Sequence, residues 1–314
     1  MSGVRDDGWA GIGRGWTDVE DVRRRLDRGA DPERWGGGRP LHRAAAFGSP
    51  EVVAEIARRV GDVDALDNGV TALWEAVAHR RPEIARVLAE AGADPWRRSL
   101  GGWSPGRLSL AGPTPDLFPA RVGEHLTEAE RAAADEARLL IAALGRSVQD
   151  GTGLACVAGL DADEAVRRLA AVPVPDEEIE EVLEDPDEFD PEETEEIVGV
   201  TTVPGGCVVT QPWGYTPQAP EVLSRLSVGT VCYGLYANPK SGNQGSIARD
   251  GVIVAHDLHP GGAPDVGDDS AEVLTDFLYG GAPAAYACAF TGLRPTDARA
   301  LGGAPDRWVR LPAE

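Results

Sequence analysis

The residues best suited to chemistry lie late in the chain, at His256, Asp257 and His259. Imidazoles and a carboxylate are zinc ligands, but a zinc site needs a third or fourth protein or solvent ligand to complete it. In a strand, His256 and His259 would also point to opposite faces, because side chains alternate along a strand. We therefore expect solvated histidines in a loop and no metal site.

Three of the four cysteines, Cys156, Cys207 and Cys232, are the next candidates, as nucleophiles with His256 as the base, but no local signature of a cysteine enzyme surrounds them. Their apolar neighbours, such as Val208 and Val231, indicate buried thiols. No two of the four form a Cys-x-x-Cys pair, so we expect neither a disulfide frame nor a zinc site. The residues concerned are Cys156, Cys207, Cys232 and Cys288.

A phosphate-binding loop is also absent from the sequence. The Gly-rich segment 241–246 has no Lys at the position that a phosphate loop requires, and we interpret it as a hairpin turn. The sequence therefore predicts no catalytic, cofactor-binding or metal-binding residue, and no cofactor. One recognition site is a candidate: Trp213 and Tyr215 flank Gly214, and two aromatic rings on a glycine bend can line a small pocket or pack at the edge of a core.

The charge distribution divides the chain. Residues 1–110 hold 17 acidic and 17 basic side chains, whereas residues 111–314 hold 35 acidic and 13 basic ones, which gives the net charge of -22. Nucleic-acid binding needs a basic surface, so we exclude it. We also expect no secretory signal and no membrane span, because the charge-free stretch 277–293 contains Gly and Pro. The expected location is the cytoplasm.

Most of the acidic excess is concentrated in residues 176–196, which hold 14 acidic residues in 21 positions and no basic one. Such a block is either a solvated insertion or a docking surface for a basic partner, because a field of one sign accelerates association with the other. Ile179, Val182 and Leu183 recur at helical spacing and predict a short helix that ends before Pro186. The partner-binding candidates of this segment are Asp176, Glu177, Glu178, Glu180, Glu181, Glu184, Asp185, Asp187, Glu188 and Asp190.

The first third of the chain repeats with a period of 32 residues: Leu41 matches Leu73 and Glu51 matches Glu83. Each copy predicts two short helices with one apolar stripe apiece, and Pro82 suits the start of a helix while Gly92 suits a helix end. A unit of this size has too little to bury alone, so the units must stack into a solenoid.

These residues resemble the ankyrin repeat. Residues 39–45 (RPLHRAA) are similar to its opening, 48–53 (GSPEVV) to its second helix, and 92–95 (GADP) to its closing turn, which recurs at 29–32. The resemblance covers about residues 10–110, with residues 17–31 as a degenerate first copy and a fourth copy from Gly102 that departs after Leu110. It implies a structural role for His42, whose counterpart Trp74 breaks the pattern.

The resemblance also implies a scaffold that binds proteins through its turns and first helices. By position, the partner-binding candidates are Trp35, Arg43, Leu66, Glu75, Trp96 and Leu100. Trp and Arg are frequent interface anchors, but the tryptophans could equally pack against a neighbouring repeat or the second domain. With three to four units, the array could also dock onto its own C-terminal domain.

Beyond a Pro-rich break, Thr127 and Glu130 form a capping box that predicts a helix to about Leu144. Strands are predicted at 197–203, 207–211, 230–236 and 252–256, with helices at 163–170, 220–226 and from Asp269 to about Leu278. The motifs 159–161 (GLD) before a helix, 213–215 (WGY) after a strand and 223–227 (LSRLS), followed by a strand with Asn238, resemble an uncharacterised actinomycete domain family over about residues 150–290, which implies no known reaction. We expect three regions: ankyrin repeats at 1–112, a connector with a capping helix at 113–149, and an acidic domain at 150–314.

The predicted fold class is an all-α ankyrin solenoid followed by an α+β domain with a mainly antiparallel sheet. The function that follows is a non-catalytic protein-interaction module that binds a basic protein, as an inhibitor or an immunity-like protein would. The alternatives are a small-molecule sensor or an enzyme in the C-terminal domain that the repeats localise, and an oligomeric structural protein.

Overall fold

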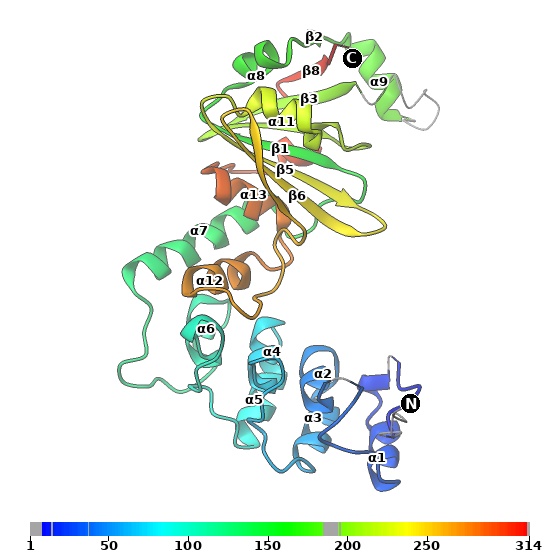
Figure 1. Ribbon diagram of the computed structural model, residues 1–314, viewed down its shortest axis with the longest axis vertical. Coiled ribbons are helices and arrows are strands. Elements are labelled where there is room, and N and C mark those ends of the chain that lie inside the picture. Colours follow the sequence, from blue (N-terminus) through cyan, green and yellow to red (C-terminus); the bar gives the residue numbers. More distant parts are fainter. Residues whose placement is uncertain (1–7, 14, 37, 185–193, 195, 313–314) are drawn as a thin grey trace. The chain divides into compact units, whose positions relative to one another are not determined.

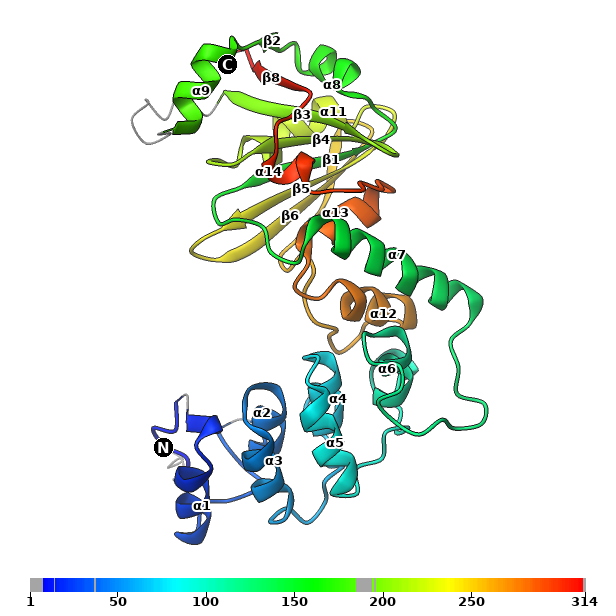
Figure 2. The ribbon, with the colours of Figure 1, turned by 180° about the vertical axis from the view of Figure 1, so that it is seen from behind.

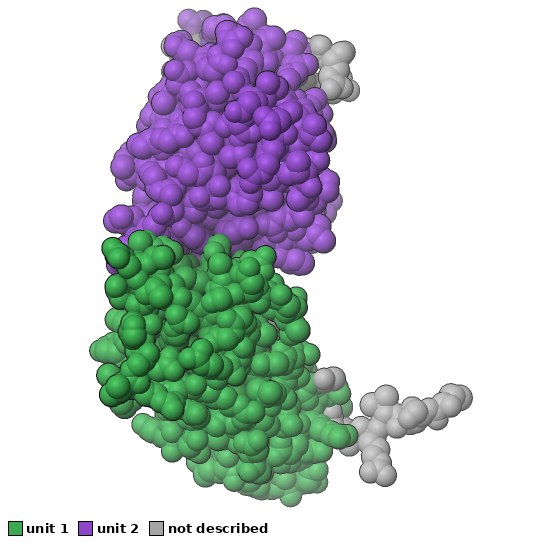
Figure 3. Space-filling model, turned by 60° about the vertical axis from the view of Figure 1, so that its left-hand side comes forward, with its two compact units in different colours: residues 1–134, 263–278 green, residues 135–262, 279–314 purple. Residues whose placement is uncertain are grey.

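The computed structural model describes residues 8–13, 15–36, 38–184, 194 and 196–312 (Figure 1). The chain divides into two compact units, coloured in Figure 3. Unit 1 comprises Met1–Ala134 and Ala263–Leu278, and unit 2 comprises Asp135–Gly262 and Tyr279–Glu314. A segment distant in sequence therefore belongs with the N-terminal repeats.

Unit 1 is built on two complete helix pairs, α2 (Pro40–Phe47) with α3 (Pro50–Ala57) and α4 (Ala72–Ala78) with α5 (Pro82–Glu90). Prolines begin three of these helices, where a missing N–H costs nothing. Ser49 Oγ accepts a hydrogen bond from Val52 N at 3.3 Å, and Thr71 Oγ1 accepts one from Trp74 N at 3.1 Å. The apolar stripes are buried as the spacing predicts.

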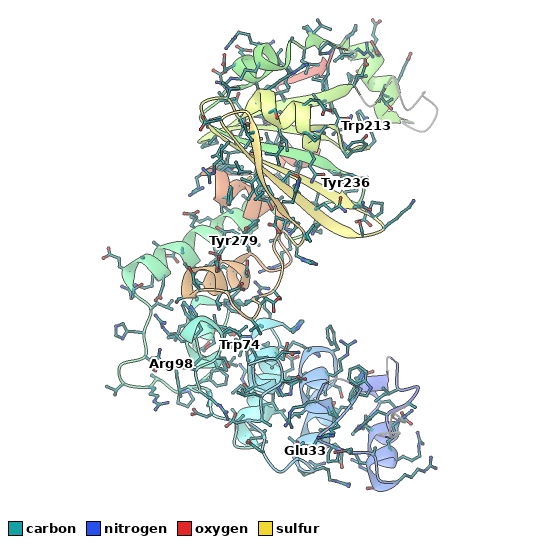
Figure 4. The ribbon with its side chains drawn as sticks, viewed as in Figure 1. Glu33, Trp74, Arg98, Trp213, Tyr236 and Tyr279 are labelled. Atoms are coloured by element: carbon teal, nitrogen blue, oxygen red, sulfur yellow. The ribbon has the colours of Figure 1, made fainter. Side chains whose placement is uncertain are left out.

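Successive pairs are joined by polar contacts as well as by packing. His42 is buried, and its Nε2–H donates to the carbonyl of Val70 in the next pair at 3.0 Å. No residue that the structure describes forms a hydrogen bond with the Nδ1 atom of His42. Arg81 reaches back to the carbonyls of Ala46 and Gly48 at 3.1 and 2.7 Å. Trp74, labelled in Figure 4, is buried at the position that His42 has in the preceding pair.

The N-terminal end of the array is closed by tryptophans. A short 3-10 helix, η1 (Gly15–Thr17), stands before α1 (Val19–Asp27) in place of a full first helix. Trp9 and Trp16 are buried and stack with their centroids 5.3 Å apart, and the Trp9 indole donates to the Asp31 carbonyl at 2.8 Å. The two buried rings therefore pack at the end of the array where the first helix is reduced to a single 3-10 turn.

The C-terminal end of the array is closed by a helix from far along the chain. After η2 (Leu100–Gly102), helix α6 (Pro105–Ala111) packs on α4, and α12 (Ser270–Tyr279) joins unit 1. The Trp103 indole donates to the Ser270 carbonyl at 2.8 Å. Arg80 donates to the carbonyls of Phe277 and Leu278 at 2.7 and 3.1 Å, and its guanidinium lies 5.6 Å from the Phe277 ring.

The expected capping box begins helix α7 (Glu128–Leu144). Glu130 N donates to Thr127 Oγ1 at 3.2 Å, and Thr127 N donates back to Glu130 Oε2 at 2.8 Å. The two bonds satisfy donors that the first turn would otherwise leave free. Glu130 thereby holds a fixed position at the start of α7.

Unit 2 contains one antiparallel sheet in the order β2-β8-β3-β4-β1-β5-β6-β7 (Figure 2). The register places Cys156 of the central strand β1 opposite Val208 of β4 and Tyr233 of β5. The strands are β1 (Gly153–Ala158), β2 (Val172–Pro173), β3 (Ile197–Val203), β4 (Gly206–Gln211), β5 (Val231–Asn238), β6 (Gly242–Arg249), β7 (Val252–Asp257) and β8 (Arg307–Arg310).

Helices cover both faces of this sheet. Leu169 of α8 (Ala162–Leu169) and Leu223 of α11 (Pro220–Leu226) share one core with β1, β3 and β4. Helix α13 (Pro283–Thr291) packs on β1 and β5. Helix α9 (Asp176–Glu184) has a smaller core with β3, and α14 (Arg299–Gly302) packs on β3 and β4.

The predicted fold class is confirmed: a helical N-terminal region precedes an α+β region whose sheet is antiparallel. The four predicted strands correspond to β3, β4, β5 and β7, and the helices predicted in the second half of the chain to α7, α8, α11 and α12. The hairpin predicted at 241–246 is present between β5 and β6, but the turn is placed too late, because β6 begins at Gly242 and pairs with β5 from there. The strands β1, β2, β6 and β8 and the helix α13 were not predicted.

The packing of α12 against the repeats can be tested at two adjacent glycines, Gly101 and Gly102. Both Gly101 and Gly102 have positive φ, 53° and 76°, so alanine at either costs roughly 1 kcal/mol in backbone strain. A Cβ at Gly101 would also lie 2.8 Å from the Asp269 carbonyl oxygen and 2.9 Å from Val273 Cγ2, whereas Gly102 has nothing within 4 Å. We predict that G101A lowers the free energy of unfolding by about 1–3 kcal/mol more than G102A, measured by urea titration of tryptophan fluorescence. Equal losses would contradict the packing of α12 on this turn.

The buried His42 predicts a pH dependence of stability. Burial lowers the pKa of His42 below its ordinary value of 6.5, outweighing the bond to Val70. The unfolded chain therefore takes up the proton first, and stability falls as the pH drops from about 6.5 through the lower folded-state pKa. We expect the urea midpoint to decrease less between pH 7.5 and 5.5 in H42Q than in the wild type. H125Q, which removes an exposed histidine, should retain the wild-type decrease; a decrease of equal size in all three proteins would exclude His42 as the cause.

Candidate protein-binding surfaces

The 32-residue period places one side chain of each first helix at an equivalent position. Arg43 of α2, Glu75 of α4 and Arg107 of α6 form one such series, and Phe47, His79 and Ala111, four residues later, form another. Residues four apart lie on the same face of a helix, so the two series run side by side along the array. Arg43 and Phe47 are exposed, whereas the apolar stripe behind them is buried.

A cluster of aromatic and charged side chains occupies this face on the second and third units. The Arg43 guanidinium lies 4.1 Å from the centroid of Phe47 and 5.6 Å from that of Trp35. The Phe47 ring is 50% exposed and contacts the His79 ring at 5.1 Å, and His79 lies 3.4 Å from a carboxylate oxygen of Glu75. We call these five residues, Trp35, Arg43, Phe47, Glu75 and His79, the first-helix surface.

Arg43 makes no ion pair with any residue that the structure describes. Its equivalent, Arg107, also lies over an aromatic ring, 4.3 Å from the centroid of Trp103, but donates to both carboxylate oxygens of Glu130 at 2.7 and 2.8 Å. The same position in the repeat therefore has a carboxylate partner in the fourth unit and none in the second.

The remaining array candidates have mixed surroundings. Trp35 is half-buried against Trp16, edge to face at 5.3 Å, which combines packing with membership of the first-helix surface. Trp96 is half-buried against Gly106, where an added Cβ would lie 2.8 Å from its ring. Leu66 is 45% exposed, and Leu100 is half-buried near Gly69. Trp35, Arg43 and Glu75 thus lie on one surface, whereas Trp96 packs between neighbouring repeats.

The acidic candidates lie on or after α9. Ile179 and Val182 are buried against β3, together with Trp213 and Trp308, so Glu177, Glu180 and Glu181 are exposed. Glu178 pairs with Arg310 of β8. Asp176 and Glu184 are the first and last residues of α9, and Asp185, Asp187, Glu188 and Asp190 lie outside the described residues.

Trp213 and Tyr215 contact different rings. Trp213 stacks on Trp308 with centroids 5.8 Å apart and donates its indole N–H to the Thr194 carbonyl at 3.0 Å. Tyr215 is 52% exposed and meets Tyr236 edge to face at 6.1 Å (Trp213 and Tyr236 are labelled in Figure 4). Trp213 thus packs with α9, while Tyr215 lies at the surface against a different ring.

The cysteines, His256 and Asp257 are buried or make side-chain contacts, whereas the His259 side chain is exposed. All four cysteines are free and buried, and burial raises the pKa of Cys207 to about 12. The pKa of Cys156 is raised well above its usual value by its contact with Cys288, 3.8 Å between sulfurs, and by burial. The expectation of loop histidines is wrong for His256, which is exposed but lies in strand β7. His256 contacts Ser246 across the strands at 3.2 Å, and Asp257 accepts from Tyr233 at 2.7 Å.

The described residues contain neither a metal-binding cluster nor a membrane-spanning helix. They contain no group of three or more His, Cys, Asp or Glu side chains arranged to hold a metal ion. Nor does any of their helices have the length and apolar character needed to cross a membrane.

Phe47, His79 and Arg107 were missed as site residues. The signal for them was present, because a period of 32 carried forward from Arg43 reaches Glu75 and then Arg107, and the same step from Phe47 reaches His79. The partner of Arg107, Glu130, has no such signal, because α7 lies outside the repeats.

Comparison with protein families gives one match, a model described as ankyrin repeats in three copies, at residues 17–99. No curated protein gives a significant match to the chain. The matched residues run from the start of the first degenerate unit to the turn before α6. The chain thus contains ankyrin repeats at residues 17–99, which suggest a protein-binding module, and continues into a C-terminal region with an eight-stranded antiparallel sheet.

Proposed function

We propose that this protein is a non-catalytic binding protein that contacts its protein partner through the first-helix surface. The observation that carries the proposal is the exposed Arg43, whose guanidinium lies against the half-exposed Phe47 ring at 4.1 Å. Arg and aromatic side chains dominate the energetic centres of protein interfaces, because they supply large contact area and directed hydrogen bonds. The ankyrin repeats support the same class of function.

A charge placed on the Phe47 ring tests this surface. The full chain is purified from source-cell lysate, and stoichiometric companions are identified by mass spectrometry for the wild type, F47D and V122D. Val122 is a fully exposed apolar side chain in a loop, so V122D controls for the added charge. We expect a companion with the wild type and V122D and its loss with F47D, because a carboxylate at Phe47 would have to be desolvated on binding.

Retention of the same companion by a folded F47D protein would show that binding occurs elsewhere. No companion in any preparation would favour the alternative role, a small-molecule sensor or an enzyme in the C-terminal unit.

As a second candidate, we propose that α9 binds a basic protein. The supporting observation is that Ile179 and Val182 hold the helix on unit 2, so that Glu177, Glu180 and Glu181 are presented to solvent together. Aligned charges raise association rates with a surface of opposite sign. Where that surface is the partner's active site, binding inhibits it in the manner of an immunity-like protein.

The second candidate predicts a kinetic effect. The E177Q/E180Q/E181Q variant should associate with a basic companion roughly 10-fold more slowly at low salt, and the difference should disappear at high salt. The matched control is E90Q/E128Q/E221Q, which removes three exposed glutamates from other helices. Stopped-flow association rates at two salt concentrations decide the question, and an equal slowing by both variants would assign the effect to net charge alone.

A further inference from the structure

The fourth unit of the array shows what an arginine at this repeat position binds. Arg107 is half-buried over the Trp103 ring and donates to both oxygens of the Glu130 carboxylate. Glu130 lies in the first turn of α7, where the capping box with Thr127 fixes it. A carboxylate is favoured there, because the first turn of a helix exposes N–H groups and positive dipole charge.

The second repeat of the array has the arginine and the aromatic rings of that arrangement but not the carboxylate. Arg43 has the equivalent position, and two rings hold its guanidinium, Phe47 at 4.1 Å and Trp35 at 5.6 Å. The side chain is exposed, and no residue that the structure describes forms an ion pair with it. Ring contacts limit the rotamers of an arginine, so less entropy is lost when it binds a carboxylate.

The neighbouring charges restrict where that carboxylate can come from. Glu75 occupies the next equivalent position along the array and contacts His79 at 3.4 Å. If the partner placed a second carboxylate over the third repeat, it would be repelled by Glu75. An apolar side chain there would instead contact the exposed Phe47 ring. The surface therefore fits one acidic residue followed by an apolar one.

We propose that the first-helix surface selects a partner helix that carries Glu or Asp in its first turn, bound by Arg43 as Arg107 binds Glu130, with an apolar side chain one turn later on Phe47. This inference rests on the proposed function and specifies the chemistry of its partner. The two compact units would then bind partners of opposite charge. In unit 2, α9 is complementary to a basic surface, and in unit 1, Arg43 is complementary to an acidic side chain.

The test uses a displayed library of random peptides of about 20 residues, panned against the full-length protein. We expect enriched peptides with Glu or Asp near the start of a predicted helix and an apolar residue three or four positions later. R43Q should weaken their binding roughly 10- to 100-fold, as expected for a lost hydrogen-bonded charge pair. R86Q, which removes an exposed arginine of α5 without an ion pair, is the matched control and should bind normally.

A double-mutant cycle completes the experiment. Replacing the acidic residue of the best synthetic peptide by its amide should weaken binding to the wild type and have little effect on binding to R43Q. The inference is overturned if no peptide is enriched, if the enriched peptides lack an acidic residue, or if the two substitutions act additively. Peptides that need Phe47 but not Arg43 would refute the inference alone, whereas peptides that need neither would also refute the first-helix surface as the binding site.

Discussion

Contact between successive helix pairs is the interaction on which unit 1 depends. A single pair such as α2 with α3 has apolar residues on the sides that meet its neighbours, and it cannot bury them by itself. The polar bonds between units, from His42 to Val70 and from Arg81 to Ala46 and Gly48, cross the same interfaces. They satisfy carbonyls that stacking removes from water, so they determine the register between pairs more than the total stability.

A stack held in this way must be closed at both ends, and the two ends solve the problem differently. The first unit lacks a full first helix, and Trp9 and Trp16 pack there as stacked rings. The last unit lacks a regular second helix and instead receives α12, whose residues lie more than 150 positions after Trp103. Because α12 contacts Arg80 and Trp103, the third and fourth units are partly occupied by the protein's own chain, and the exposed aromatic and charged side chains are concentrated on α2 and the adjoining face of α4.

Sequence reasoning recovered the elements whose signals are local. Apolar spacing and caps predicted α2 to α5, and the Thr127–Glu130 box predicted α7. It failed where the environment decides. Helix α13 is buried on several sides, at Ala284, Ala287 and Cys288 among others, and therefore shows no single apolar stripe. The glycines of β6 resembled a turn, although Gly245 is required there because Tyr233 and Asp257 leave no room for a side chain. The placement of α12 with the repeats depends on contacts between distant residues, which no local pattern encodes.

The same limit explains why the candidate site was only partly predicted. Arg43 and Arg107 are equivalent in the repeat, and each lies over an aromatic ring. Their local sequences therefore do not show which of the two arginines has an ion-pair partner. The two arginines differ in their ion pairs. Helix α7 brings Glu130 to Arg107, whereas no carboxylate of the described residues pairs with Arg43. Residues 1–110 have equal numbers of acidic and basic side chains, but Arg43, Glu75 and Arg107 alternate in sign along the first helices. The proposed selection by charge therefore does not require a net charge. Selection in such an array depends on the order of charges along the first helices rather than on their sum, because a bound side chain interacts mainly with charges within a few ångströms of it.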